Sequence, residues 1–224
     1  MNLREKYHIP NDSIITIAGT VGVGKSTMTK VLADALQFKT SLEKVEANPY
    51  LENFYADFER WSFHLQIYFL AERFKEQKRI VDHGGGFIQD RSIYEDTGIF
   101  AKMHYENGTM SKVDYETYTN LFEAMVMTPY FPHPDLLIYL EGTLDEVVER
   151  INIRGREMEK NTPFSYWEEM YTRYENWINS FNSCPVLRIK ISDYDLMKKE
   201  QSVEPILDKV GHLIRQSRKM RELV

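Results

Sequence analysis

Residues 13–36 read SIITIAGTVGVGKSTMTKVLADAL and combine a strand signal, a glycine loop and a helix signal in that order. The β-branched residues of SIITIAG predict a buried strand, and residues 25–36 have helical spacing. Between them, residues 19–26 fit the pattern G-x-x-x-x-G-K-[ST] in full. A position after a strand and at the start of a helix is the context that this pattern requires. The stretch therefore predicts a loop that binds the phosphates of a nucleotide.

The chemistry of this loop follows from its residue types. Glycines let the backbone form a nest of N–H donors, and the helix N-terminus adds a partial positive charge. We expect Lys25 to reach the β- and γ-phosphates of ATP and Ser26 to ligate Mg²⁺. The residues predicted to hold the phosphates are Gly19, Thr20, Val21, Gly22, Val23, Gly24, Lys25, Ser26 and Thr27.

Composition limits the classes of partner. The 224 residues suit one domain, 1–224, with its own core. A net charge of -6 gives no general reason to bind nucleic acid or a membrane surface. The single cysteine, Cys184, fits a reducing cytoplasm. No apolar run is long enough to span a membrane, and the N-terminus lacks the apolar core of a signal peptide. We expect a cytoplasmic protein with small-molecule ligands.

The rest of the chain alternates strand and helix signals. Short apolar runs predict strands at 86–90, 136–140 and 186–191, with a weaker one at 41–46. Helical patterns cover residues 61–79, 92–104, 111–127, 143–153, 163–182 and 203–219. Strands separated by helices predict an α/β fold, a five-stranded parallel sheet flanked by helices. Ligands bind at the carboxyl ends of such strands, so the residues that follow each strand are the candidates for a site.

Several reaction classes remain open to a phosphate-binding loop. No N-K-x-D motif of GTP-binding switch proteins is present. Glu141, at the end of the 136–140 strand, gives a motor or ATPase only weak support. A kinase of small molecules needs a carboxylate near the acceptor hydroxyl and arginines near the transferred phosphoryl group. Glu46 follows the second candidate strand, and Asp90 and Arg91 end the third.

Two further clusters favour a kinase. Ser92 and Glu95 fit a capping box, which would hold Arg91 at a strand–helix junction facing the loop. Arg150 and Arg154 share one helical face, and Arg156 follows a glycine. These three arginines predict a lid, about residues 150–163, that closes over phosphates.

The helix at 61–79 carries polar residues in an unusual place. It is apolar nearly all round and should be buried, yet Gln66 and Arg73 lie on one face of it. A buried arginine needs a partner, and Asp96 is the obvious candidate. Such a set against aromatic walls is suited to reading a flat, polar base.

Four segments in register, GTVGVGKST, ERWSFHLQIYFLAERF, QDRSIYEDTGIFAK and RGREME, together resemble the deoxynucleoside kinase family. Their order and spacing are similar to those of bacterial deoxyadenosine, deoxycytidine and deoxyguanosine kinases, over about residues 13–210. The resemblance implies the P-loop kinase fold and transfer of phosphate from ATP-Mg²⁺ to the 5′-hydroxyl of a deoxynucleoside. It also implies a dimer, for which residues 92–127 offer a helix surface.

Carried over residue by residue, the resemblance implies a role for each candidate. Glu46 would be the general base on the 5′-hydroxyl, with Arg91 beside it. The 3′-hydroxyl would be held by Tyr55 and Glu159. The remaining assignments are Gln66, Arg73 and Asp96 for the base, Arg150, Arg154 and Arg156 for the lid, Asp193 and Tyr194 for the adenine of the donor, and Ser26 and Asp90 for the metal. Asp90 stands where many animal members have a glutamate, so its metal contact could run through water.

The substrate follows from the hydrogen-bonding character of Asp96. An ionised aspartate only accepts hydrogen bonds, so it favours the exocyclic amine of deoxyadenosine or deoxycytidine over thymidine. Deoxyguanosine stays open, because Arg73 could donate to its carbonyl oxygen. Two other readings also stay open: a nucleoside monophosphate kinase of the thymidylate type, and a nucleotide-binding subunit without catalysis. Glu46 and Glu159 argue against the first, and Glu46 and Arg91 against the second.

Overall fold

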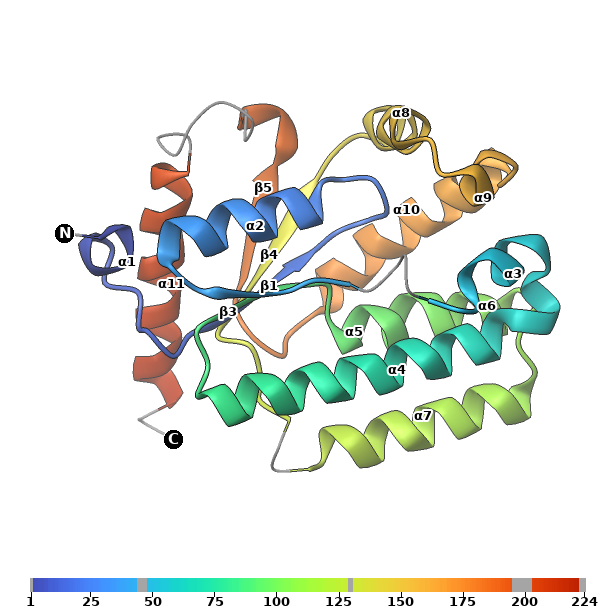
Figure 1. The fold of residues 1–224 in the computed structure, drawn as a ribbon, viewed down its shortest axis with the longest axis horizontal. Coiled ribbons are helices and arrows are strands. Elements are labelled where there is room, and N and C mark those ends of the chain that lie inside the picture. Colours follow the sequence, from blue (N-terminus) through green and yellow to red (C-terminus); the bar gives the residue numbers. More distant parts are fainter. Residues whose placement is uncertain (1, 44–47, 129–130, 195–202, 222–224) are drawn as a thin grey trace.

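The computed structural model describes residues 2–43, 48–128, 131–194 and 203–221 (Figure 1). Five strands form one parallel sheet in the order β2-β3-β1-β4-β5, which confirms the predicted sheet. The strands are β1 (Ile14–Ala18), β2 (Lys39–Ser41), β3 (Phe87–Asp90), β4 (Leu136–Glu141) and β5 (Val186–Lys190).

The central strand places the phosphate loop. All five residues of β1 are buried, as expected for a strand with neighbours on both edges and helices on both faces. Ile17 is in register with Asp90 of β3 and with Ile138 of β4. The loop after β1 and the Asp90–Arg91 segment after β3 therefore leave the sheet side by side at its carboxyl edge.

The second strand differs from the prediction of 41–46. β2 ends at Ser41, which is in register with Gln89. Pairing stops there because β3 ends one residue later and the chain turns at Arg91, whose φ is 65°. Leu42 and Glu43 lie beyond the strand, and residues 44–47 lie outside the described part of the chain.

Helices cover the sheet (Figure 1). The α-helices are α1 (Leu3–Lys6), α2 (Lys25–Leu36), α3 (Leu51–Ala56), α4 (Phe58–His83), α5 (Ile93–Glu95), α6 (Lys102–Glu106), α7 (Lys112–Val126), α8 (Leu144–Arg154), α9 (Glu157–Lys160), α10 (Phe164–Ser180) and α11 (Glu204–Arg221). The short helices α1, α3 and α9 were not predicted, because fewer than two turns show no apolar period.

The predicted helix 92–104 is divided into three parts. Residues 96–101 form a π-helix, η1 (Asp96–Ala101), between α5 and α6. Gly98 lies in this segment against Trp177, where an added Cβ would be 2.8 Å from the indole nitrogen. The wider π turn, which is common at functional sites, carries Asp96 and Phe100. Apolar periodicity cannot distinguish it from a regular helix.

The helices α4 and α7 pack side by side along the lower edge of the view in Figure 1. α4 is longer than the predicted 61–79. Asp57 caps its start by accepting from the Arg60 N–H at 3.0 Å, and Gly84, with φ 84°, ends it. Within the described residues, no helix is both long and apolar enough to cross a membrane.

Candidate active site

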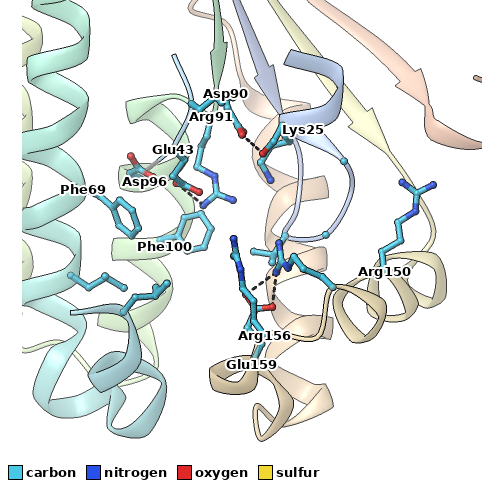
Figure 2. A pocket seen from close by; sticks show the side chains of 18 of the residues that line it. Lys25, Glu43, Phe69, Asp90, Arg91, Asp96, Phe100, Arg150, Arg156 and Glu159 are labelled. Atoms are coloured by element: carbon cyan, nitrogen blue, oxygen red, sulfur yellow. Dashed lines mark hydrogen bonds and ion pairs between the residues drawn. The ribbon is translucent and has the colours of Figure 1, made fainter. Parts of the chain in front are cut away.

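A cavity of about 630 Å³ opens at the carboxyl ends of β1 and β3. The phosphate loop forms one side, α3, α4 and η1 form another, and α8 and α9 form a third (Figure 2). The predicted site residues that line it are Val21, Gly22, Gly24, Lys25, Ser26, Thr27, Tyr55, Gln66, Asp90, Arg91, Asp96, Arg150, Arg154, Arg156 and Glu159.

The remaining predicted residues lie elsewhere. Gly19, Thr20 and Val23 complete the loop behind its rim. Arg73 stands behind Asp96 and contacts it. Glu46 is outside the described residues. Asp193 is exposed in a 3₁₀ turn, η2 (Ile191–Asp193), and the half-buried Tyr194 packs on the core, so neither lines this cavity. Their place beside the adenine of a donor stays a prediction.

Lys25 curls across the phosphate loop. Gly24, in a left-handed conformation with φ 103°, starts α2, and Lys25 follows it. Its Nζ donates to the carbonyl oxygens of Gly19 and Thr20 at 2.8 and 2.9 Å. Burial lowers the pKa of Lys25 to about 8, and the nearby Arg91 cation adds to this. The ammonium is therefore desolvated and already positioned for an anion in the loop.

Ser26 and Asp90 form the candidate metal site. The Ser26 hydroxyl donates to Asp90 Oδ2, and the buried Oδ1 of Asp90 has no hydrogen-bond partner among the described residues. A hydroxyl and a carboxylate with a free oxygen fit Mg²⁺, which takes oxygen ligands and is usually held by one or two carboxylates together with substrate phosphates.

Arg91 occupies a strained turn at the wall of the cavity. It is buried with φ 65°, which is uncommon for a residue with a side chain. Its guanidinium lies 4.6 Å from the centre of the Phe100 ring, and Nη1 is 3.5 Å from the carboxylate of Glu43. Burial opposes its charge, but Glu43 raises the pKa of Arg91 well above its ordinary value. In the view of Figure 2, Arg91 lies between Asp96 and Lys25.

Glu43 is the site residue that sequence reasoning missed. It lines the cavity, and its carboxylate also accepts from Arg73 Nη2 at 2.8 Å. Burial would raise its pKa, but Arg91 and Arg73 together hold the pKa of Glu43 below its ordinary value. A rule that searches just after each strand would have found Glu43 if β2 had been predicted to end at Ser41.

Two of the three residues predicted to read the base, Arg73 and Asp96, contact each other, and Gln66 is the third. Arg73 Nε donates to Asp96 Oδ2 at 3.0 Å, and Nη1 donates to the Asp90 carbonyl at 2.9 Å. Burial raises the pKa of Asp96, and Arg73 offsets part of that rise. Gln66 is 2% exposed, and its Oε1 has no hydrogen-bond partner in the described part of the chain. Phe69 and Phe100 supply aromatic walls (Figure 2).

The predicted lid arginines separate into a pair and a single residue. Arg154 Nη2 donates to both carboxylate oxygens of Glu159 at 2.7 and 2.6 Å, and Arg156 Nη1 reaches the same carboxylate at 3.4 Å. Arg150 instead donates to the Val23 carbonyl at 3.4 Å and lies apart from them in Figure 2. The lid therefore carries its own counter-ion, Glu159. Burial in the pocket wall raises the pKa of the nearby Tyr55, and the charge of Glu159 adds to this rise.

A phosphate-binding loop with a desolvated lysine faces a carboxylate, arginines and an aromatic-walled pocket, which is the arrangement of a P-loop kinase that acts on a small molecule. The chain belongs to the deoxynucleoside kinase family, whose family model matches residues 15–215.

Individual relatives agree with this family. A deoxyadenosine/deoxycytidine kinase of Bacillus subtilis is 71% identical over 96% of this chain and 99% of its own. A deoxyadenosine kinase of Dictyostelium discoideum is 38% identical over 80% of this chain and 73% of its own. The solved structure of deoxyadenosine kinase from M. mycoides with bound dATP superposes with a TM-score of 0.75. It is 31% identical and covers 89% of this chain and 99% of its own. The predicted P-loop kinase fold is therefore confirmed.

Proposed function

We propose that this chain transfers the γ-phosphoryl group of ATP to the 5′-hydroxyl of deoxyadenosine and deoxycytidine, in deoxynucleotide salvage. The observation that carries the proposal is the Arg73–Asp96 ion pair, whose Asp96 lines the same pocket as Lys25. The similarity to a deoxyadenosine/deoxycytidine kinase of B. subtilis supports the same substrates.

Base choice follows from hydrogen-bonding capacity. Arg73 holds one oxygen of Asp96, and the carboxylate accepts from an amine. The amide oxygen of Gln66, which has no hydrogen-bond partner among the described residues, is a second acceptor for the same edge of a base. Adenine and cytosine each present an exocyclic amine there, whereas thymine presents a carbonyl. Deoxyguanosine stays the alternative within the family, since Arg73 could donate to its carbonyl oxygen.

For the acceptor hydroxyl, we propose Glu43 as the general base in place of Glu46. Its pKa lies below the ordinary value, so it is ionised at neutral pH and can accept the proton as transfer proceeds. Lys25 and Arg91 offset charge on the transferred group, and the lid arginines close over it. Ser26 and Asp90 would hold Mg²⁺, which supplies charge neutralisation on the phosphates when bound.

The sugar end of the pocket favours a nucleoside over a nucleotide. We assign Tyr55 and Glu159 to the 3′-hydroxyl, as neighbours on the pocket wall. A nucleoside monophosphate kinase would need cations for a second phosphate at the acceptor position. Glu43 stands beside Arg91 there and makes that runner-up less favourable.

The chain as a whole is proposed to be one cytoplasmic kinase domain that forms a homodimer. One sheet, the family match over residues 15–215 and the single cysteine support the first part. The outer face of α7 supports the second. Val113, Thr117, Leu121 and Ala124 are exposed along it at helical spacing, without a charge among them, and we call these four residues the α7 stripe.

The test is phosphate transfer from labelled ATP-Mg²⁺ to deoxyadenosine, deoxycytidine, deoxyguanosine and thymidine, with deoxycytidine and thymidine monophosphates alongside. We expect transfer to deoxyadenosine and deoxycytidine and little to thymidine or either monophosphate. The Lys25→Ala variant is the matched blank, because it removes the loop cation. Transfer to monophosphates alone would contradict the proposal, and transfer mainly to deoxyguanosine would support the alternative.

A further inference from the structure

Glu95 makes more contacts than a helix cap requires. Its side chain is fully buried, and Oε2 accepts from the Ser92 N–H at 2.8 Å and the Ser92 hydroxyl at 3.3 Å. These bonds confirm the predicted capping box. The other oxygen, Oε1, accepts from the Tyr174 hydroxyl at 3.0 Å and from the Gly19 N–H at 3.4 Å. One carboxylate therefore connects three separate segments.

Each of these segments carries a part of the site. Gly19 is the first residue of the phosphate loop, and Ser92 follows Arg91 directly. Tyr174 belongs to α10, the helix that follows the lid, and its ring lies edge-on to Phe100 with centres 6.1 Å apart. Phe100 in turn lies under the Arg91 guanidinium. Glu95 itself does not line the cavity.

The charge of Glu95 also matters to its neighbours. Arg91 Nε is 3.9 Å from Oε1 and has no hydrogen-bond partner among the described residues. Burial raises the pKa of Glu95 to about 7, while Arg91 and Lys25 counteract that rise and Asp96 adds to it. When ionised, the carboxylate is a buried counter-charge beside Arg91.

We propose that Glu95 is a positioning residue for phosphoryl transfer, which holds the phosphate loop and the Arg91 turn at a fixed separation. The proposal rests on the roles proposed above for Lys25 and Arg91. Transfer in line between two bound molecules is sensitive to small misplacements, and a shift of about 1 Å can cost on the order of 10²-fold in rate. A carboxylate bonded to both halves limits such a shift.

The test is the Glu95→Gln variant, which keeps the size of the side chain. Its amide oxygen can still accept from Ser92, but its NH₂ would meet the Gly19 N–H as donor against donor and no longer balances Arg91. We expect kcat to fall by roughly 10- to 100-fold and KM for ATP to rise, while KM for the deoxynucleoside stays within about twofold.

A matched control exists in the same chain. Glu146 forms a second capping box with Thr143, through bonds of 2.8 and 3.1 Å, and is only half-buried. Unlike Glu95, Glu146 does not connect separate segments of the site. Glu146→Gln therefore removes only a cap charge, and we expect wild-type kcat and KM for ATP. Thermal unfolding of both variants separates a loss of fold from a loss of position.

Tyr174→Phe keeps the proposal testable if Glu95→Gln fails to fold. It removes one hydroxyl from Oε1 and leaves the carboxylate, so we expect a several-fold fall in kcat without the large loss of Glu95→Gln. In the double variant the two losses should not add, since both act through the same oxygen. The inference would be overturned if Glu95→Gln had the same kcat and KM for ATP as Glu146→Gln. If Glu95→Gln does not fold, Tyr174→Phe takes its place in this comparison. An inactive wild type would instead count against the proposed function.

Discussion

Glu43 is held by two guanidinium groups, one of which belongs to the base-reading pair. Arg73 donates to Glu43 at 2.8 Å and to Asp96 at 3.0 Å, so the same side chain contacts the proposed catalytic carboxylate and the proposed base reader. Each of these three residues is a buried or nearly buried charge that depends on the others for its partner. Removing the Glu43 charge leaves the Arg73–Asp96 bond in place, so it should affect catalysis more than binding of the base.

We predict that Glu43→Gln loses about 10²- to 10⁴-fold in kcat, the range for a positioned general base, with little change in KM for the deoxynucleoside. Steady-state kinetics with deoxyadenosine measures both parameters. Glu46→Gln is the matched control, because Glu46 is the carboxylate that the sequence favoured. Near-normal turnover of Glu43→Gln together with a collapse of Glu46→Gln would return the role to Glu46.

The choice between Glu43 and Glu46 shows what the sequence could and could not supply. The loop residues 19–26 and the Asp90–Arg91 pair were placed well, because a full motif and a strand end fix them independently. Glu43 and Glu46 are three residues apart, and choosing between them required the end of β2. That end is set by pairing with β3 and by the turn at Arg91, which are contacts distant in sequence. Local pattern carries no information about them.

At the scale of elements, the segment from α5 to α6 differs most from its sequence pattern. A single helix was predicted over 92–104, and the π turn of η1 was not. The π turn leads directly into α6. In α6, His104 is 2% exposed, and the centre of its ring lies 5.1 Å from the centre of the Phe54 ring. Nδ1 of His104 lies 2.9 Å from the Thr109 hydroxyl, and Nε2 has no hydrogen-bond partner within the described ranges.

We predict that His104 makes the fold less stable in acid. Burial lowers the pKa of His104 to about 4, from an ordinary value of 6.5. Between these values the unfolded chain binds a proton that the folded protein excludes, so this contribution is complete above pH 6.5 and is lost as pH falls through 4. Its full size is about 3 kcal/mol. Urea unfolding at pH 7 and pH 4 measures it.

His104→Gln is the comparison for that measurement, because it removes the titrating ring and keeps a polar group near Thr109. The free energy of unfolding should then fall less between pH 7 and pH 4 than it does in the wild type. The carboxylates titrate in both proteins and cancel in the difference. An identical fall in the two proteins would show that His104 binds a proton as readily in the folded protein as in the unfolded chain.

At the scale of the whole molecule, alternating apolar runs and helical patterns were enough to predict a five-stranded parallel sheet flanked by helices. The strand order, with β1 at the centre, is consistent with the usual right-handed crossover connections between parallel strands. An assembly surface is different, because a core face and an interface face both present apolar side chains at the same spacing. On α7 the structure separates a buried face from an exposed one: Tyr118 is fully buried, whereas the α7 stripe lies on the outside.

We predict that the α7 stripe forms the homodimer interface and that Leu121→Glu converts the protein to monomers. A charge buried against its own symmetry copy costs far more than the same charge in water, and a two-fold contact places it there twice. Light scattering after size-exclusion chromatography should give twice the chain mass for the wild type and one chain mass for Leu121→Glu. Met220→Glu is the control, since Met220 is 63% exposed on α11 and should leave the dimer intact. No residue of α7 lines the described cavity, so the monomer should still bind deoxynucleoside. A dimer that survives Leu121→Glu but not Met220→Glu would move the interface to α11.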